Sequence, residues 1–269
     1  MLILLPPSEG KTPAASGEPL DLAGLWLPEL APARQRVLTK LVAMCRRSSA
    51  RSIADSLGVL GLSEGQRAEI ARNAELPDAP AAPAAEVYTG VLYEALDVET
   101  LDDAARAWLL PAAVVFSGLW GVVRLGDRIP AYRCSVGVTF PAPVGGLAAY
   151  WKKGLRKALD QAAADGPVLD LRSGAYAAMW APPAESASRV AALRVLHERV
   201  VDGVPKRSVV SHFNKATKGR LVRALATECA TPGTVDDLIT AMRDLTFTVE
   251  ERPSPAGRPR QLDIVVTDL

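Results

Sequence analysis

Short apolar segments of strand length alternate along this chain with longer segments of helical periodicity. The first, Met1 to Leu5, is apolar throughout and is ended by Pro6 and Pro7, so it predicts a buried β-strand. Further segments suited to strands lie at 112–116, 168–171, 190–200, 208–212, 245–251 and 261–266. The last two alternate apolar and polar side chains and predict a closing hairpin. Strands scattered among helices predict an α/β or α+β fold, with a mixed β-sheet flanked by helices.

Helices are expected at 29–47, 52–57, 63–73, 100–110, 150–164, 214–229 and 234–244. In 29–47 the apolar side chains fall on one face, which places Arg34 and four other cations around it. The Pro-rich connector 77–83 is short and apolar, so we interpret it as a loop within one domain. The 269 residues are therefore predicted to form a single domain, 1–269.

The formal net charge of +1 hides a segregation of charge along the chain. Residues 203–227 and 30–54 carry six Lys or Arg each and no acid, whereas residues 73–105 carry eight acids and no Lys or Arg. Basic stripes on a neutral protein are typical of a phosphate-rich partner. The alternative is that each run is one solvated helix face.

The segment at about 52–73 resembles a helix-hairpin-helix, in which turn amides approach a DNA phosphate. Gly58 and Gly61 lie in the expected turn, but Ser63 replaces the second glycine of the usual Gly-hydrophobic-Gly core. An ordinary helical hairpin is the alternative interpretation.

Several kinds of site are excluded by the pattern of residues. Cys45, Cys134 and Cys229 are widely spaced and the chain has two His, so no metal site and no cofactor are predicted. Reduced thiols fit a cytoplasmic protein. The sequence has no signal peptide or membrane-spanning run, so no membrane partner is expected.

Two catalytic patterns also fail on inspection. The Gly10-Lys11-Thr12 segment lacks the glycine five residues earlier that a phosphate-binding P-loop needs. Ser173 follows a predicted strand, but neither His is tied to it by a hydrolase pattern.

Six short segments, taken in order, resemble the YaaA family of bacterial peroxide-stress proteins across essentially the whole chain. They are Ser8–Thr12 after the first strand, Val87–Gly90, Ser117–Gly121 with Arg124, Asp127, Ile129, Tyr132 and Arg133, Tyr150-Trp151, Leu169–Tyr176, and Ser211–Lys215 with Lys218, Gly219 and Arg223. Two details depart from the family pattern. The opening motif gains Glu9, and the usual Lys-rich stretch before Gly219 reads Asn214-Lys215-Ala216-Thr217-Lys218.

The resemblance implies a single-domain mixed α/β fold with a basic cleft and a helix-hairpin-helix-like element. It also implies a cytoplasmic DNA-binding protein that limits oxidative damage during hydrogen peroxide stress, a role associated with restraining free iron.

Two hypotheses follow, and the first is a DNA-binding protein with little sequence specificity. Its cations would neutralise phosphates of double-stranded DNA, and the turn of the hairpin would offer backbone amides. The residues expected to bind DNA are Lys206, Arg207, Lys215, Lys218, Arg220, Arg223, Arg46, Arg47, Arg51, Gly58, Gly61 and Ser63.

The second hypothesis is an enzyme acting on a nucleotide or nucleobase, a nucleotide-like small molecule. Glu9 would be a general acid or base beside Lys11, Arg133 or Arg172 would clamp a phosphate, and Trp120 or Tyr176 would stack a base. The candidate catalytic or ligand-binding residues are Ser8, Glu9, Lys11, Tyr88, Ser117, Trp120, Arg133, Arg172, Ser173, Tyr176, His212, Asn214 and Lys215. The alternative readings are a surface Glu9–Lys11 pair and aromatic residues that belong to the core.

Overall fold

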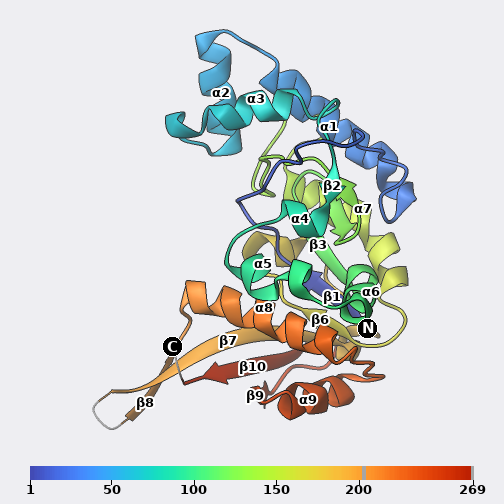
Figure 1. Cartoon of the computed structure of the whole chain (residues 1–269), viewed down its shortest axis with the longest axis vertical. Helices are drawn as coiled ribbons and strands as arrows, with labels where there is room; N and C mark the ends of the chain where they lie inside the picture. Colours follow the sequence, from blue (N-terminus) through green and yellow to red (C-terminus); the bar gives the residue numbers. More distant parts are fainter. Residues whose placement is uncertain (202–203, 268–269) are drawn as a thin grey trace.

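A mixed β-sheet forms the centre of the molecule, which is known from a computed structural model (Figure 1). The structure describes residues 1–201 and 204–267, and for Val201, Ser211 and His212 it describes the backbone alone. The strands are β1 (Leu2–Leu5), β3 (Ala113–Ser117), β4 (Gly121–Arg124), β6 (Val168–Asp170), β7 (Val190–Val201), β8 (Val204–Ser208), β9 (Thr248–Arg252) and β10 (Arg260–Val266). Their order is β4-β3-β1-β6-β7-β10-β9, with β8 paired to β7.

The first strand lies inside this sheet rather than at an edge. β1 is parallel to β3 and to β6, and β7 is parallel to both β6 and β10. β1 and β3 are buried along their whole length, as expected for apolar strands covered on both faces. The carboxyl ends of β1, β3 and β6 therefore meet at one edge of the sheet.

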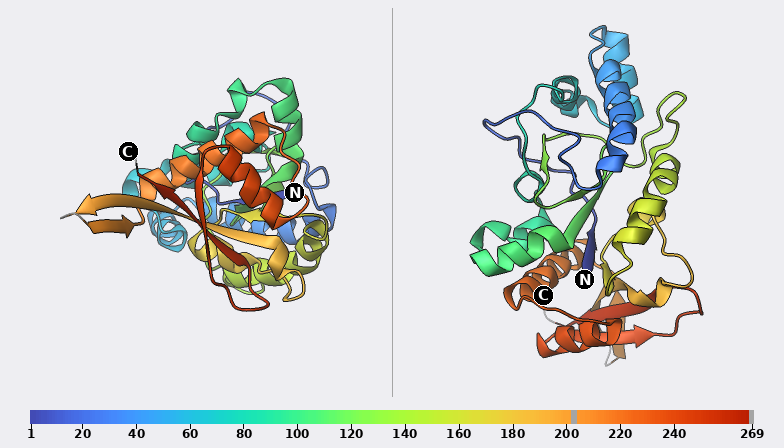
Figure 2. Two further views of the ribbon diagram at one scale, coloured as in Figure 1. Left: turned by 90° about the horizontal axis from the view of Figure 1, so that it is seen from below. Right: turned by 90° about the vertical axis from the view of Figure 1, so that its right-hand side faces the viewer.

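Helices cover both faces of the sheet and also extend beyond it. They are α1 (Ala31–Cys45), α2 (Ala50–Leu60), α3 (Ala68–Ala74), α4 (Ala84–Val87), α5 (Val91–Leu96), α6 (Asp103–Ala112), α7 (Leu147–Ala162), α8 (Ser211–Thr227) and α9 (Val235–Asp244). A small pair, β2 (Ala82–Pro83) with β5 (Arg128–Ile129), lies apart from the main sheet. Figure 2 shows α5 and α6 on one side of β1 and β3, and α7 on the other.

The fold class predicted from the sequence is confirmed: the chain is mixed α/β, with helices flanking a mixed sheet. The predicted strands at 112–116, 168–171 and 190–200 correspond to β3, β6 and β7, and the closing hairpin to β9 and β10. The predicted strand at 208–212 is wrong. β8 ends at Ser208 and α8 begins at Ser211, so that segment is the turn between a strand and a helix.

Candidate functional site

The loop that follows β1 is held against the segment around Tyr88. Lys11 forms an isolated β-bridge with Tyr88, and the Thr12 amide donates to Val87 O at 2.9 Å. The Thr89 amide donates to Ser8 Oγ at 3.1 Å. These contacts bring two segments far apart in the sequence to the carboxyl ends of β1 and β3.

Lys11 is half-buried at this point, with its ammonium group close to two aromatic rings. Its Nζ donates to Ser8 O at 2.7 Å and lies 4.4 Å from the ring centre of Tyr132 and 5.3 Å from that of Tyr88. Burial, together with the charge of Arg133, lowers the pKa of Lys11 to about 7. A substantial share of Lys11 is therefore a neutral amine at neutral pH.

Three buried hydroxyl groups form a chain beside Lys11. Tyr88 Oη is 2.8 Å from Tyr132 Oη, which is 2.6 Å from Ser117 Oγ. Ser117 Oγ also accepts from the amides of Leu119 at 3.2 Å and Trp120 at 2.9 Å. Because it accepts two N–H groups, its own proton is available to Tyr132. Burial raises the pKa of Tyr88 and Tyr132 well above the ordinary value, so both stay protonated.

Arg133 connects the loop after β1 to helix α3 through hydrogen bonds. Its guanidinium donates to Glu9 Oε2 at 2.8 Å and to Glu9 O at 2.9 Å. Its backbone exchanges two hydrogen bonds with the Asn73 side chain, at 2.9 Å and 2.8 Å. The bond from Arg133 lowers the pKa of Glu9, so Glu9 is an ionised partner of Arg133.

Two further predicted residues lie close to these groups. Tyr176 Oη accepts from the Val136 amide at 3.4 Å, and burial raises the pKa of Tyr176 to about 12, with smaller effects from Glu9 and Arg133. The exposed Lys215 of α8 is near enough to Glu9 to contribute to its lowered pKa. We call this group the Lys11 site, which consists of Ser8, Glu9, Lys11, Tyr88, Ser117, Tyr132, Arg133, Tyr176 and Lys215.

Two of the predicted ligand-binding residues are not available to a ligand. Trp120 is fully buried, so the prediction that it stacks a base is wrong. Arg172 is 7% exposed, and its guanidinium donates to both carboxylate oxygens of Asp170 and to the carbonyls of Tyr176 and Trp180. The prediction that Arg172 clamps a phosphate is therefore also wrong. Of the other predictions, Ser173 is exposed, Asn214 is half-buried and the side chain of His212 lies outside the described residues.

The basic run in α8 contains side chains with three different environments. Lys215 and Arg220 are exposed. Lys218 is 5% exposed and donates to Leu171 O at 2.9 Å, so the prediction that it contacts phosphate is wrong. Arg223 donates to Leu96 O at 3.0 Å and Asp97 O at 2.7 Å, which holds it against α5. The helix therefore presents two of its predicted cations to solvent.

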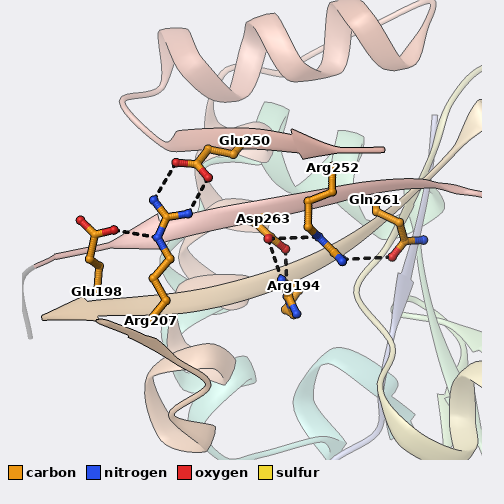
Figure 3. Close-up of polar contacts among 7 residues, drawn as sticks. All are labelled: Arg194, Glu198, Arg207, Glu250, Arg252, Gln261 and Asp263. Atoms are coloured by element: carbon orange, nitrogen blue, oxygen red, sulfur yellow. Dashed lines mark hydrogen bonds and ion pairs between the residues drawn. The ribbon is translucent and has the colours of Figure 1, made fainter. Parts of the chain in front are cut away.

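The hairpin of β7 and β8 holds Arg207 between acids. Figure 3 shows its guanidinium between Glu198 and Glu250, at 2.7 Å and 2.6 Å. Beside it, Arg194 and Arg252 both pair with the buried Asp263. Arg207 therefore joins three strands, while Lys206 on the same strand is exposed.

The second basic run lies at the other end of the long axis, where α1 and α2 are found (Figure 1). Arg46 and Arg47 are exposed, although each also donates to a backbone carbonyl, and Arg51 is exposed. Arg34, predicted to lie around the apolar face, is instead fully buried. A duplex that contacted both basic runs would have to follow the length of the molecule.

α2 and α3 are joined by a turn in which Gly61 has a positive φ of 65°, whereas Gly58, which was expected in the turn, lies inside α2. The amides of Gly61, Leu62 and Ser63 donate to Gly58 O, Leu57 O and Gln66 Oε1. These amides stabilise the turn itself, and a phosphate contact by this hairpin stays a prediction.

The candidate residues chosen from the sequence left out two groups. Tyr132 was named only within a family motif, and Asn73, which binds the backbone of Arg133, was not a candidate. Their partners are 44 and 60 residues away in the chain, which no local pattern reports. The exposed cations of α7 could have been predicted from the sequence, because residues 128–159 contain no acid. Within this run two pairs of cations are spaced four residues apart, Lys152 with Arg156 and Lys153 with Lys157.

In residues 1–201 and 204–267 no cluster of His, Cys, Asp and Glu is suited to hold a metal ion. Over the same part of the chain, no helix is long and apolar enough to cross a membrane.

The fold and the Lys11 site define a mixed α/β protein with a half-buried lysine at the carboxyl ends of parallel strands. Residues 1–252 match the family model described as peroxide stress protein YaaA. A UPF0246 protein of Streptomyces coelicolor is 51% identical over 270 residues, covering 100% of both chains. One of Corynebacterium efficiens is 42% identical over 99% of this chain and 100% of its own, and an uncharacterized Campylobacter jejuni protein is 30% identical over 82% and 83%. The chain therefore belongs to the YaaA family.

Proposed function

We propose that this protein acts in the peroxide stress response by binding double-stranded DNA through its phosphates, with little sequence preference. The peroxide role rests on the description of the family. The observation that carries the DNA proposal is the exposure of Lys215 and Arg220 within the acid-free run 203–227, with Lys215 close to Glu9 of the Lys11 site. Exposed cations without acidic neighbours in the sequence favour contacts with phosphate groups. Such contacts position DNA without reading its bases.

Fluorescence anisotropy against unrelated duplexes at several salt concentrations tests this proposal. We expect binding with a log–log salt slope of several units, and a weaker affinity for every duplex in a Lys215→Glu/Arg220→Glu variant. A Lys153→Glu/Lys157→Glu variant of α7 changes the net charge equally on a different helix and is expected to bind nearly as tightly as the wild type. Equal losses in the two variants would show that net charge, rather than a contact at α8, sets the affinity.

A second candidate function is favoured because residues from several of the family motifs lie together in the Lys11 site. We propose that the Lys11 site binds a nucleotide-like small molecule and acts on it as an enzyme. Arg133, Lys11 and Lys215 each lower the pKa of the acid Glu9, Arg133 most strongly, and the three hydroxyl groups can pass a proton. Ligands of open α/β sheets gather at such strand ends.

Calorimetric titration with AMP and with ribose 5-phosphate tests this second proposal. Binding that is lost in an Arg133→Ala variant and kept in a variant of the exposed Arg258, Arg258→Ala, would support it. Heats indistinguishable from dilution for both compounds would contradict it.

A further inference from the structure

The amine of Lys11 has the surroundings of a nucleophile rather than those of a surface cation. Its Nζ donates to Ser8 O at 2.7 Å and lies 4.4 Å from the centre of the Tyr132 ring. The charged groups that act on it include the cation Arg133 and the acids Glu69 and Glu9. Glu9 is paired with Arg133 and Glu69 with Arg72, and among the described residues neither acid forms a salt bridge with Lys11. Desolvation and a neighbouring cation are the two features that keep a lysine amine uncharged and reactive.

Hydroxyl groups near Lys11 can supply the proton that a reaction of this amine would need. Nζ lies over the rings of Tyr132 and Tyr88, whose hydroxyl groups continue the chain from Ser117, and Ser117 can donate its proton along this chain. An amine that attacks a carbonyl carbon needs a proton for the departing oxygen. This chain can deliver one without solvent.

We propose that Lys11 Nζ forms a Schiff base with the aldehyde carbon of a phosphorylated sugar, which is either a free aldose phosphate or the ring-opened sugar at an abasic site in DNA. This inference deepens the second proposed function, the reaction at the Lys11 site. The neutral amine adds to the carbonyl carbon and gives a carbinolamine. Its hydroxyl group then takes a proton, the C–O bond breaks and water leaves, so the product is a protonated imine. Arg133 and Lys215 supply the positive charge that the phosphate requires.

Reductive trapping tests this reaction in the full-length protein. Sodium cyanoborohydride converts the imine into a stable secondary amine, which adds the mass of the sugar phosphate less one oxygen. The probes are ribose 5-phosphate and a duplex with one abasic site, and peptide mapping locates the adduct. We expect Lys11 to be labelled at least tenfold more than exposed lysines such as Lys153, by one or both probes. The probe that labels identifies the source of the sugar.

Two variants separate reaction from binding. Lys11→Arg keeps a long basic side chain at this position but has no nucleophilic amine, so the adduct should disappear. Lys153→Arg on α7 should label as the wild type does. The rate of labelling should be half-maximal near pH 7, in line with the pKa of about 7 for Lys11, rather than above pH 10.

One set of results would overturn the proposal, and the wild type alone provides it. Labelling by both probes spread over exposed lysines without enrichment at Lys11 excludes a Schiff base at this residue, whether or not the variants fold. Anisotropy and calorimetry on the same samples keep the other proposals separate. DNA or nucleotide binding without an adduct leaves those proposals standing and rejects this one.

Discussion

Arg34 is a fully buried arginine whose guanidinium joins three segments of the chain. It donates to the carbonyls of Trp26 at 2.7 Å, Leu27 at 3.1 Å, Trp120 at 3.1 Å and Val122 at 2.8 Å. Burial lowers its pKa to about 10, which leaves it charged at neutral pH. The arginine thus connects the loop before α1 to the start of β4.

Replacing Arg34 by Met should lower the free energy of unfolding by about 3 kcal/mol or more, because buried carbonyls lose their donors. Urea denaturation measures the change. Arg36→Met, two residues along the same helix and exposed, is the control and should stay within about 0.5 kcal/mol of the wild type. Equal effects of the two changes would show that the Arg34 hydrogen bonds contribute nothing to stability.

Arg34 also marks a limit of prediction from the sequence at this scale. The periodicity of 29–47 identified the helix and its apolar face, and it placed Arg34 outside that face. The acceptors that draw Arg34 inward come from residues 26–27 and 120–122, and local spacing does not report such contacts. The same reason explains Lys218, whose acceptor on Leu171 is 47 residues away.

At the scale of elements, α5 and α8 pack closely against each other at a glycine. A Cβ atom at Gly219 of α8 would lie 2.9 Å from Ala95 Cβ and 3.0 Å from the Leu96 amide nitrogen, both in α5, and would also clash with Leu92 O. Backbone atoms cannot move aside as the end of a flexible side chain can. The packing of α8 on α5 therefore requires glycine here.

Gly219→Ala should destabilise the protein by about 1–3 kcal/mol, even though alanine is the better helix former. Gly154→Ala in α7 is the matched control. Its Cβ would meet only Trp151 at 3.9 Å, so it should stabilise the helix by about 0.5–1 kcal/mol. Thermal unfolding of the two variants should shift in opposite directions. A stabilised Gly219→Ala variant would contradict the tight packing of α8 on α5.

Strands were predicted correctly where burial gives the sequence an apolar pattern, and they were missed where the strand is exposed or rich in turn residues. The apolar runs of β1, β3 and β6 are buried and were predicted within a residue or two. β8 is exposed at every position, so no periodicity indicates it, and its partner β7 alone gives it a place in the sheet. β4 was missed because it lies among the glycines and prolines of 117–146.

At the scale of the whole molecule, several buried titratable groups together determine how the free energy of unfolding depends on pH. Burial lowers the pKa of Lys218 to about 8, and burial with Arg133 lowers that of Lys11 to about 7, from an ordinary 10.5. Above these values and below 10.5 the unfolded chain binds more protons than the folded one. The free energy of unfolding therefore rises with pH in this range.

Buried thiols and tyrosines oppose this rise at higher pH. Burial raises the pKa of Cys45 to about 11 and that of Cys134 to about 12, from an ordinary 9.0, and raises that of Tyr176 from 10.0 to about 12. Above about pH 9 the folded state keeps protons that the unfolded state has lost. Stability should thus increase from pH 7 to about 9, level off, and fall above about 10.

Urea unfolding at pH 7, 8, 9 and 10 tests this curve, and Lys218→Met isolates one contribution to it. One buried lysine accounts for at most about 1.4 kcal/mol per pH unit, so the rise between pH 8 and 9 should be smaller in the variant by about 1 kcal/mol. Lys215→Met changes an exposed lysine three residues earlier in α8 and should leave the rise unchanged. An unchanged rise in Lys218→Met would mean that Lys218 remains charged inside the fold, with Leu171 O and Asp170 offsetting its burial.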